Sequence, residues 1–140
     1  MTGRIILTAG RNTGDRTAAA RVMARENNWP LLSVTDLTFA GSDEAKTEAV
    51  LTLLHAQVEA DVPGVVVSAP FIIELNTSEW LNDLNYDLGL RGYEATVVYV
   101  LAPGEPQPGL DPEHYFIDET DDIDDLFTVA TSIAGELRGA

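Results

Sequence analysis

Cysteine is absent from this sequence, and so are long apolar runs. Without cysteine, the chain can form no disulfide, thiolate metal site or thiol nucleophile. Without an apolar run of about 18 residues, no membrane-spanning helix is expected. The first residues, MTGRIILTAGR, interrupt their short apolar stretch with Gly3 and Arg4, so we find no secretory signal. These absences predict a cytoplasmic protein with no membrane partner.

Positive charge is scarce as well. Eight Lys and Arg residues stand against 23 Asp and Glu residues, which gives a net charge of −15. Such a chain repels phosphate backbones, and this excludes general nucleic-acid binding. Residues 111–125 hold eight acids and no base. We interpret this run first as a solvated loop and helix start. The alternatives are adaptation to high salt and an acidic C-terminal surface for a basic protein partner.

What is present is an alternation of strand and helix patterns in a chain whose 140 residues suit one domain, 1–140. Short β-branched runs predict strands, and apolar residues three to four apart predict helices. The alternation predicts an α/β fold, a three-layer, doubly wound parallel sheet of about five strands with the first strand central. We expect strands at 4–9, 31–34, 65–69, 95–101 and 115–117, and helices at 17–27, 43–60, 78–90 and 121–138, with Ser42 or Asp43 and Thr77 or Ser78 as caps.

The segment between the first strand and the first helix, residues 10–17, reads GRNTGDRT. Its length and place fit the pattern G-x-x-x-x-G-K-[ST], in which backbone N–H groups and a helix N-terminus surround phosphate oxygens. Gly10 takes the place of the first glycine, Arg16 that of the lysine and Thr17 that of the Ser or Thr. Asp15 stands where the second glycine belongs.

Two departures from this pattern change its chemistry. The Asp15 carboxylate repels an anion, and its Cβ opposes the positive φ that glycine permits. Arg16 keeps the charge of lysine but is bulkier, planar and forked. The alternative interpretation is a polar turn in which Thr13 or Asp15 caps the helix.

The whole chain resembles the P-loop small-molecule kinases, the group of nucleoside-monophosphate, shikimate and gluconate kinases. The resemblance rests on the order of elements and on four patches: GRNTGDRT (10–17), VTDL (34–37), VVVSAPF (65–71) and YFIDETDDIDDL (115–126). It implies a P-loop NTPase-like fold. Ser68 stands near the place where these kinases carry an acidic residue that helps to hold magnesium. No Arg or Lys lies where they carry an arginine-rich lid, since residues 93–136 contain neither.

If the resemblance extends to activity, it implies ATP and Mg²⁺ as cofactors and indicates the site residues. Asp36, after the second strand, would act as the base toward a substrate hydroxyl. Arg16 would contact the β- or γ-phosphate, and Thr17 would contact the metal. The cofactor-binding residues would be Gly10, Arg11, Asn12, Thr13, Gly14, Asp15, Arg16 and Thr17.

Two functions are compatible with these patterns. The departures favour a degenerate kinase-like module that is non-catalytic or binds nucleotide weakly, without a cofactor. The alternative is an atypical ATP-dependent small-molecule kinase. In either case a nucleotide or another small molecule is the expected ligand.

Among the other candidate residues, His55 fits helix packing better than catalysis. Trp29 and Trp80 fit core or edge positions. His114 with Asp111 or Glu113 is a disfavoured metal site.

Overall fold

The computed structural model describes residues 3–11, 13–37, 41–71, 75, 79–101, 115–117 and 123–139. Within these ranges, five strands form one sheet in the order β2-β3-β1-β4-β5, and every adjacent pair is parallel. The strands are β1 (Gly3–Ala9), β2 (Leu31–Ser33), β3 (Gly64–Ser68), β4 (Tyr93–Val100) and β5 (Tyr115–Ile117). The parallel sheet with β1 at its centre confirms the predicted fold.

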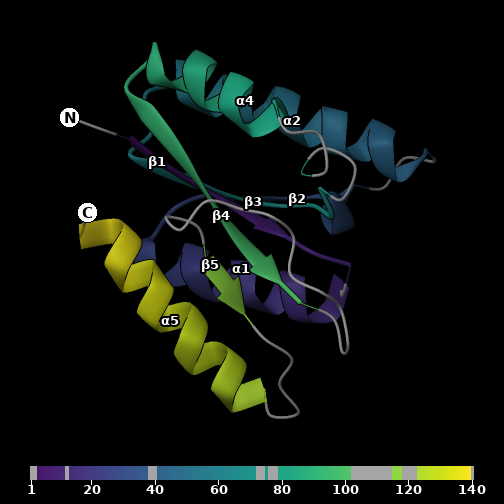
Figure 1. Cartoon of the computed structure of the whole chain (residues 1–140), viewed down its shortest axis with the longest axis vertical. Coiled ribbons are helices and arrows are strands. Elements are labelled where there is room, and N and C mark those ends of the chain that lie inside the picture. The colour runs from purple at the N-terminus through teal and green to yellow at the C-terminus, as the bar shows by residue number, and fades with distance from the viewer. Residues whose placement is uncertain are drawn as a thin grey trace.

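Helices cover both faces of this sheet (Figure 1). The helices α1 (Thr13–Asn27) and α5 (Ile123–Gly139) lie below the sheet in that view, and α2 (Asp43–Glu59) and α4 (Trp80–Gly89) lie above it. A short 3-10 turn, η1 (Val34–Asp36), follows β2. None of the helices in the described ranges combines the length and the apolar character that crossing a bilayer requires. The three layers therefore match those predicted from the alternation of elements.

Two apolar cores separate the layers, one on each face of the sheet. Along β1, Ile5 and Leu7 enter the core beneath α2 and α4, whereas Ile6 enters the core beside α1 and α5. Successive side chains of a strand point to opposite faces, so one strand supplies both cores. β3 is buried along its whole length, as a strand covered on both faces must be. The unalternated apolar runs thus place β1 and β3 inside the sheet.

The start of α1 differs from the prediction in a way that matters for the site. The helix begins at Thr13, four residues before the predicted start at Thr17. The apolar periodicity begins only after Thr17, so the polar first turn gave no helical signal. The start of α4 also differs slightly: Glu79 is its N-cap and makes no side-chain cap bond. The predicted caps Thr77 and Ser78 lie outside the described residues.

The start of α2 follows the prediction, but one of its side chains does not. Ser42 is the N-cap of α2, and its hydroxyl accepts a hydrogen bond from the Ala45 N–H at 3.1 Å. His55 is exposed on α2, so the interpretation of His55 as a packing residue on the apolar side of the helix is wrong. It follows the buried Leu54, and one further residue turns a helix by about 100°. That rotation carries His55 out of the core and onto the surface.

Candidate functional site

Gly10 lies at the carboxyl end of β1, where the chain turns toward α1. Its φ is +131°, a backbone conformation that L side chains rarely adopt, and an added Cβ would meet the Val100 carbonyl oxygen at 2.3 Å. The Gly10 N–H donates to the Pro70 carbonyl at 3.1 Å. Close packing against the ends of β3 and β4 therefore requires glycine here, whether or not a ligand binds.

The Arg16 side chain is the most unusual feature of this edge, because its exposed fraction is only 1%. Its Nε donates to Ser68 Oγ at 3.1 Å, and its Nη1 donates to the Gly10 carbonyl at 2.9 Å. These bonds connect the first turn of α1 with the carboxyl ends of β1 and β3. From the sequence, Arg16 and Ser68 were expected at the same edge of the sheet. The hydrogen bond between them was not predicted.

The rest of the segment does not form a separate loop of phosphate-binding length. Only residues 10–12 separate β1 from α1, and Asn12 lies outside the described residues. Arg11, Thr13 and Gly14 are exposed. Asp15 lies half-buried in the first turn of α1, where a negative charge interacts favourably with the helix dipole.

Two threonine hydroxyls near this edge are buried without a hydrogen-bond partner in the described part of the chain. They are Oγ1 of Thr17 in α1 and Oγ1 of Thr8 in β1. A buried polar atom without a partner costs about 1–3 kcal/mol, so each of them marks a place where another group could bind. Sequence reasoning singled out Thr17 but missed Thr8, whose only signal was a polar residue within an apolar strand.

Asp36 lies at the same edge of the sheet, after β2. It ends the turn η1, and its side chain is exposed. Ser33 stabilises the turn, because its hydroxyl accepts from the Thr35 N–H at 3.3 Å. Ser33 is in register with Ser68 on β3. The structure therefore brings Asp36 to the carboxyl edge that also carries Arg16 and Ser68.

Metal-binding side chains do not gather in this region. In the ranges that the structure describes, no group of three or more His, Asp or Glu residues is placed to hold a metal ion. The disfavoured metal site of His114 with Asp111 or Glu113 lies outside those ranges, and so do the acidic residues between 118 and 122.

The opposite, amino edge of the sheet contains a hollow that no predicted site includes. Its volume is about 220 Å³, and its walls include Asp61, Val62, Arg91 and Tyr93. The Tyr93 hydroxyl donates to the Val62 carbonyl at 2.5 Å. Burial raises the pKa of Tyr93 above its usual value, and the Asp61 charge adds to this while Arg91 opposes it. The hollow lies at the far ends of the strands from residues 10–17.

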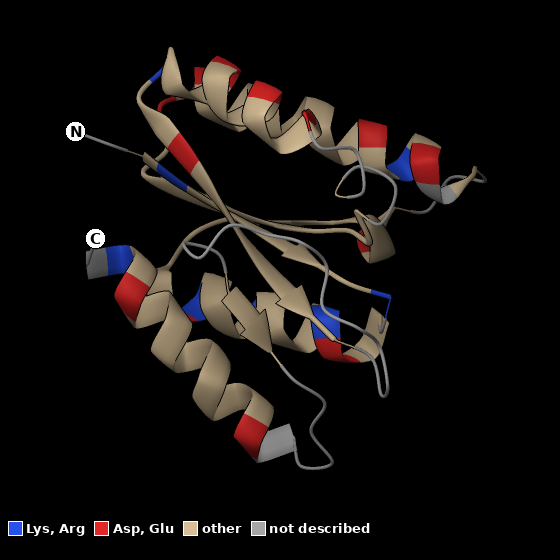
Figure 2. Ribbon diagram, in the orientation of Figure 1, with Lys and Arg blue, Asp and Glu red and all other residues tan. Residues whose placement is uncertain are grey.

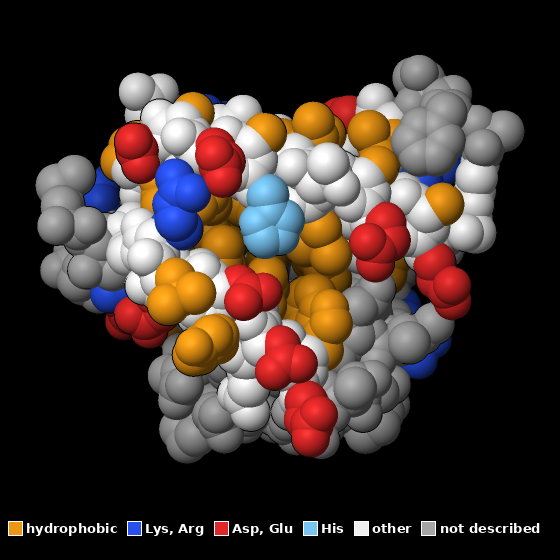
Figure 3. All heavy atoms as spheres, turned by 90° about the horizontal axis from the view of Figure 1, so that it is seen from above, with side chains coloured by type: hydrophobic (Ala, Val, Ile, Leu, Met, Phe, Trp, Pro, Cys, Tyr) orange, Lys and Arg blue, Asp and Glu red, His pale blue; other side chains and the backbone are white. Residues whose placement is uncertain are grey.

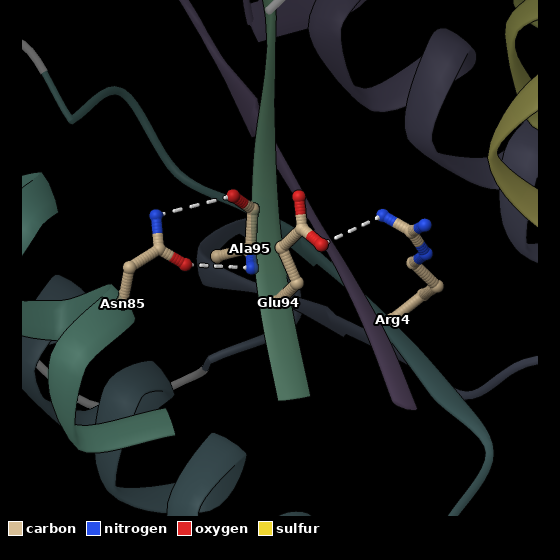
Figure 4. Close-up of polar contacts among 4 residues, drawn as sticks. All are labelled: Arg4, Asn85, Glu94 and Ala95. Carbon is tan, nitrogen blue, oxygen red and sulfur yellow. Dashed lines mark hydrogen bonds and ion pairs between the residues drawn. The ribbon is translucent and has the colours of Figure 1, made fainter. Parts of the chain in front are cut away.

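Polar contacts also hold β4 at this end (Figure 4). Arg4 on β1 pairs with Glu94 on β4 at 3.4 Å. The Asn85 amide of α4 accepts from the Ala95 N–H at 2.8 Å and donates to the Ala95 carbonyl at 3.4 Å. In the described part of the chain, β5 is in register with residues 98–100 of β4. Asn85 therefore bonds the outer β4 edge at a position that the described residues of β5 do not reach.

Comparison with known proteins gives a likeness of structure rather than of sequence. No family model matches the sequence, and no curated protein matches it. A protein from Chloroflexus aurantiacus, assigned only provisionally as a kinase, superposes with a TM-score of 0.62 at 13% identity, covering 97% of this chain and 98% of that one. The APS kinase of Mycobacterium tuberculosis superposes with a TM-score of 0.55 at 18% identity, covering 96% and 97%. These likenesses and the strand order show that the chain shares the α/β fold of these two proteins.

Proposed function

We propose that this chain is a kinase-like module without phosphotransferase activity, and that its residues 10–17 bind Mg-ATP weakly or not at all. The observation that carries the proposal is the burial of Arg16 on Ser68 and Gly10. Phosphoryl transfer needs a cation that reaches the transferred phosphate. In this segment the cations are Arg16 and Arg11.

Releasing Arg16 toward a ligand would be costly. Its guanidinium would leave behind the buried Ser68 hydroxyl and the Gly10 carbonyl, which it now satisfies. Each buried polar group left without a partner costs about 1–3 kcal/mol. We therefore assign Arg16 a structural role, in which it joins α1 to the ends of two strands.

The surroundings of Arg16 also oppose the binding of a polyanion. The early start of α1 leaves a short connection after β1, and the Gly10 N–H is already bonded to Pro70. A carboxylate such as that of Asp15 repels a phosphate oxygen about 4 Å away by about 4 kcal/mol at an effective dielectric near 20. We conclude that the residues present do not fit a triphosphate with its magnesium.

One observation favours the alternative, an atypical ATP-dependent small-molecule kinase. The Thr17 hydroxyl, at the position predicted to contact the metal, is buried and lacks a partner among the described residues. An ion or a phosphate oxygen would satisfy it. Asp36, exposed at the same edge, would then be the candidate base toward a substrate hydroxyl.

Calorimetric titration with millimolar Mg-ATP tests the two functions. We expect no heat of binding with the wild type. The double variant Asp15→Gly with Arg16→Lys removes the repelling carboxylate and the forked side chain, and should bind Mg-ATP weakly. The matched control, Asp125→Gly with Arg21→Lys, makes the same exchanges at exposed positions of α5 and α1 and should remain inert.

Micromolar binding by the wild type would overturn the proposed function. The alternative would then predict that Thr17→Val loses this binding, because valine keeps the shape but not the hydroxyl. In the absence of ligand, Thr17→Val should be neutral or slightly stabilising, since it removes a buried hydroxyl without a partner.

A further inference from the structure

The face of the sheet that α2 and α4 cover has a feature that is separate from the candidate nucleotide site at residues 10–17. α2 packs on β2 and β3, whereas α4 packs on β4. β1 lies between β3 and β4 in the sheet, so the two helices stand on either side of it. Figure 3 views this face and shows a hollowed strip with hydrophobic side chains along it and acidic side chains around it. We call this strip the α2/α4 groove.

The side of α2 that borders the groove is fixed by one ion pair. Glu59, at the end of α2, pairs with Arg91, just after α4, at 3.0 Å. Residues four apart on a helix share a side, so His55 and Leu51 lie on the same side as Glu59. His55 is exposed, and the half-buried Leu51 packs against the core below.

The side of α4 that borders the groove follows from Asn85. Its amide bonds Ala95 at the outer edge of β4, away from β1 and α2. Asp83 and Asp87 are each two residues from Asn85, about 200° around the helix. Both carboxylates are exposed, and they lie on the side of α4 that faces α2.

The groove is therefore apolar at its base and acidic along its rims. The half-buried Trp80 lies beside Phe71, with ring centroids 5.6 Å apart and the rings tilted by 39°, and packs on the core. At the far end of α4, Tyr86 and Leu90 are 70% and 72% exposed. A continuous apolar strip that is rimmed by polar residues, as Figure 3 shows here, is typical of a protein interaction surface. Asp83, Asp87, Glu48 and Glu59 supply the acidic rim.

We propose that the α2/α4 groove binds a basic amphipathic helix of a partner protein. An apolar stripe of that helix would lie on Trp80, Leu51 and Leu90, and its Lys or Arg residues would meet Asp83 and Asp87. α4 has ten residues, so the groove beside it is about 15 Å long and suits a helix of about three turns. This inference is independent of the proposed function, because none of the groove residues belongs to the segment 10–17.

The negative charge of the groove rim favours a basic helix over a second copy of the chain or a nucleic acid. A second copy of the chain would bring a rim of the same sign, and like charges placed opposite one another disfavour association. Nucleic acid is repelled for the same reason. The basic residues of the two helices are limited to Lys46, and Arg91 beyond α4 is already paired with Glu59. A cationic partner therefore gains most from this surface.

Fluorescence anisotropy with a defined probe tests the proposal. The probe is a labelled 14-residue peptide of Leu and Lys at helical spacing, and a Leu and Glu peptide of the same pattern is its counterpart. We expect the intact protein to bind the Leu/Lys peptide and not the Leu/Glu peptide. The variant Asp83→Lys with Asp87→Lys should bind at least about tenfold more weakly, since two attractive contacts become repulsive.

The matched control reverses two exposed acids on the other face, Glu26→Lys with Asp125→Lys. It changes the net charge by the same amount and should weaken binding less than about threefold, since its charges lie away from the peptide. Leu90→Ala, at an exposed position that does not threaten folding, should also weaken binding. ¹⁵N-labelled protein should show the largest peptide-induced shifts in α2 and α4.

Four outcomes would overturn the proposal. The first is no peptide binding, and the second is equal losses in the two charge-reversed variants, which would indicate attraction to net charge alone. The third is unchanged binding by Leu90→Ala, because the exposed apolar side chain at the end of α4 would then contribute nothing. The fourth is a dimer in sedimentation experiments that Asp83→Lys with Asp87→Lys dissociates, since the groove would then be occupied by a second copy.

Discussion

The two faces of the sheet differ in how closely their helices approach each other. On the α1/α5 face, the buried side chains between the helices include alanines of both, among them Ala20, Ala24, Ala130 and Ala134. Small side chains let two helices pack closely. That core also holds larger side chains, such as Met23 and Leu126. In the described part of the other face, the apolar side chains that α2 and α4 bury are valines and leucines, such as Leu54 and Leu84, and these two helices stand apart on the two sides of β1.

The faces also differ in charge (Figure 2). α2 and α4 together carry six acidic residues and one basic residue, whereas α1 and α5 carry five acidic and four basic residues. In addition, polar bonds join α1 to α5: Asn27 Nδ2 donates to the Ala134 carbonyl at 3.1 Å, and Arg138 donates to the Glu26 carbonyl at 2.9 Å. The helices of the α1/α5 face are thus held together by packing and polar bonds. The helices of the α2/α4 face stand apart and carry an excess of negative charge.

This comparison indicates that the two faces of the sheet have different roles. The closely packed α1/α5 face contributes mainly stability, and the α2/α4 face carries the groove proposed to bind a partner. If that is correct, substitutions that add bulk should be tolerated on one face and not on the other.

The largest effect is expected for Ala134→Leu on α5. Ala134 is fully buried between α1 and α5, and the added carbons have no space, so we expect a loss of about 3 kcal/mol in the free energy of unfolding. Urea denaturation followed by circular dichroism measures this loss. The control is Ala56→Leu on the exposed side of α2, which should change stability by less than about 0.5 kcal/mol. Equal losses for both variants would break the comparison.

A smaller effect is expected for Asn85→Ala, which tests what holds α4 in place. The change removes both bonds to Ala95 and leaves a backbone N–H and a carbonyl without these partners at the edge of β4. We expect a loss of about 2 kcal/mol. Asn82→Ala, at an exposed position on the same helix, is the control and should be neutral in the same denaturation experiment. A neutral Asn85→Ala would show that apolar packing alone positions α4.

The smallest effect is expected for the ion pair between Glu59 and Arg91, which joins the ends of α2 and α4. Its side chains are 72% and 44% exposed, so solvent screens the interaction. A double-mutant cycle with Glu59→Ala and Arg91→Ala should give a coupling of about 0.5 kcal/mol or less, falling as salt is added. A coupling well above 1 kcal/mol that persists in salt would mean that this pair, rather than packing, sets the width of the α2/α4 groove.

Much of the fold could be predicted from the sequence because its signals are local. The apolar runs at β1, β3 and β4 and the glycine and proline residues between elements determine where strands occur. The prediction for β5 agrees with the structure residue for residue. Alternation of strands with helices then leaves few topologies besides a parallel sheet with right-handed crossovers.

The candidate site was predictable only in part. The pattern in residues 10–17 placed Gly10 directly after the first strand, as in the structure, whereas Arg16 and Thr17 lie inside α1. The phosphate and metal contacts expected for these residues stay predictions. The early start of α1 was not predicted, because its polar first turn lacks the apolar periodicity that distinguishes a helix from a loop. The buried Thr8 hydroxyl near this site was not predicted, because a single threonine within an apolar strand is common.

By itself, then, the sequence determined the order of the elements, the central position of β1 and the excess of negative charge, all of which depend on residues close together in the chain or on composition. Tertiary structure decided the contacts of Arg16, because Ser68, which accepts its hydrogen bond, is 52 residues away in the sequence. It also decided that Gly10 must pass close to Val100 and that a groove remains between α2 and α4. Burial and contact are properties of surfaces that meet only after folding, so no local pattern can encode them.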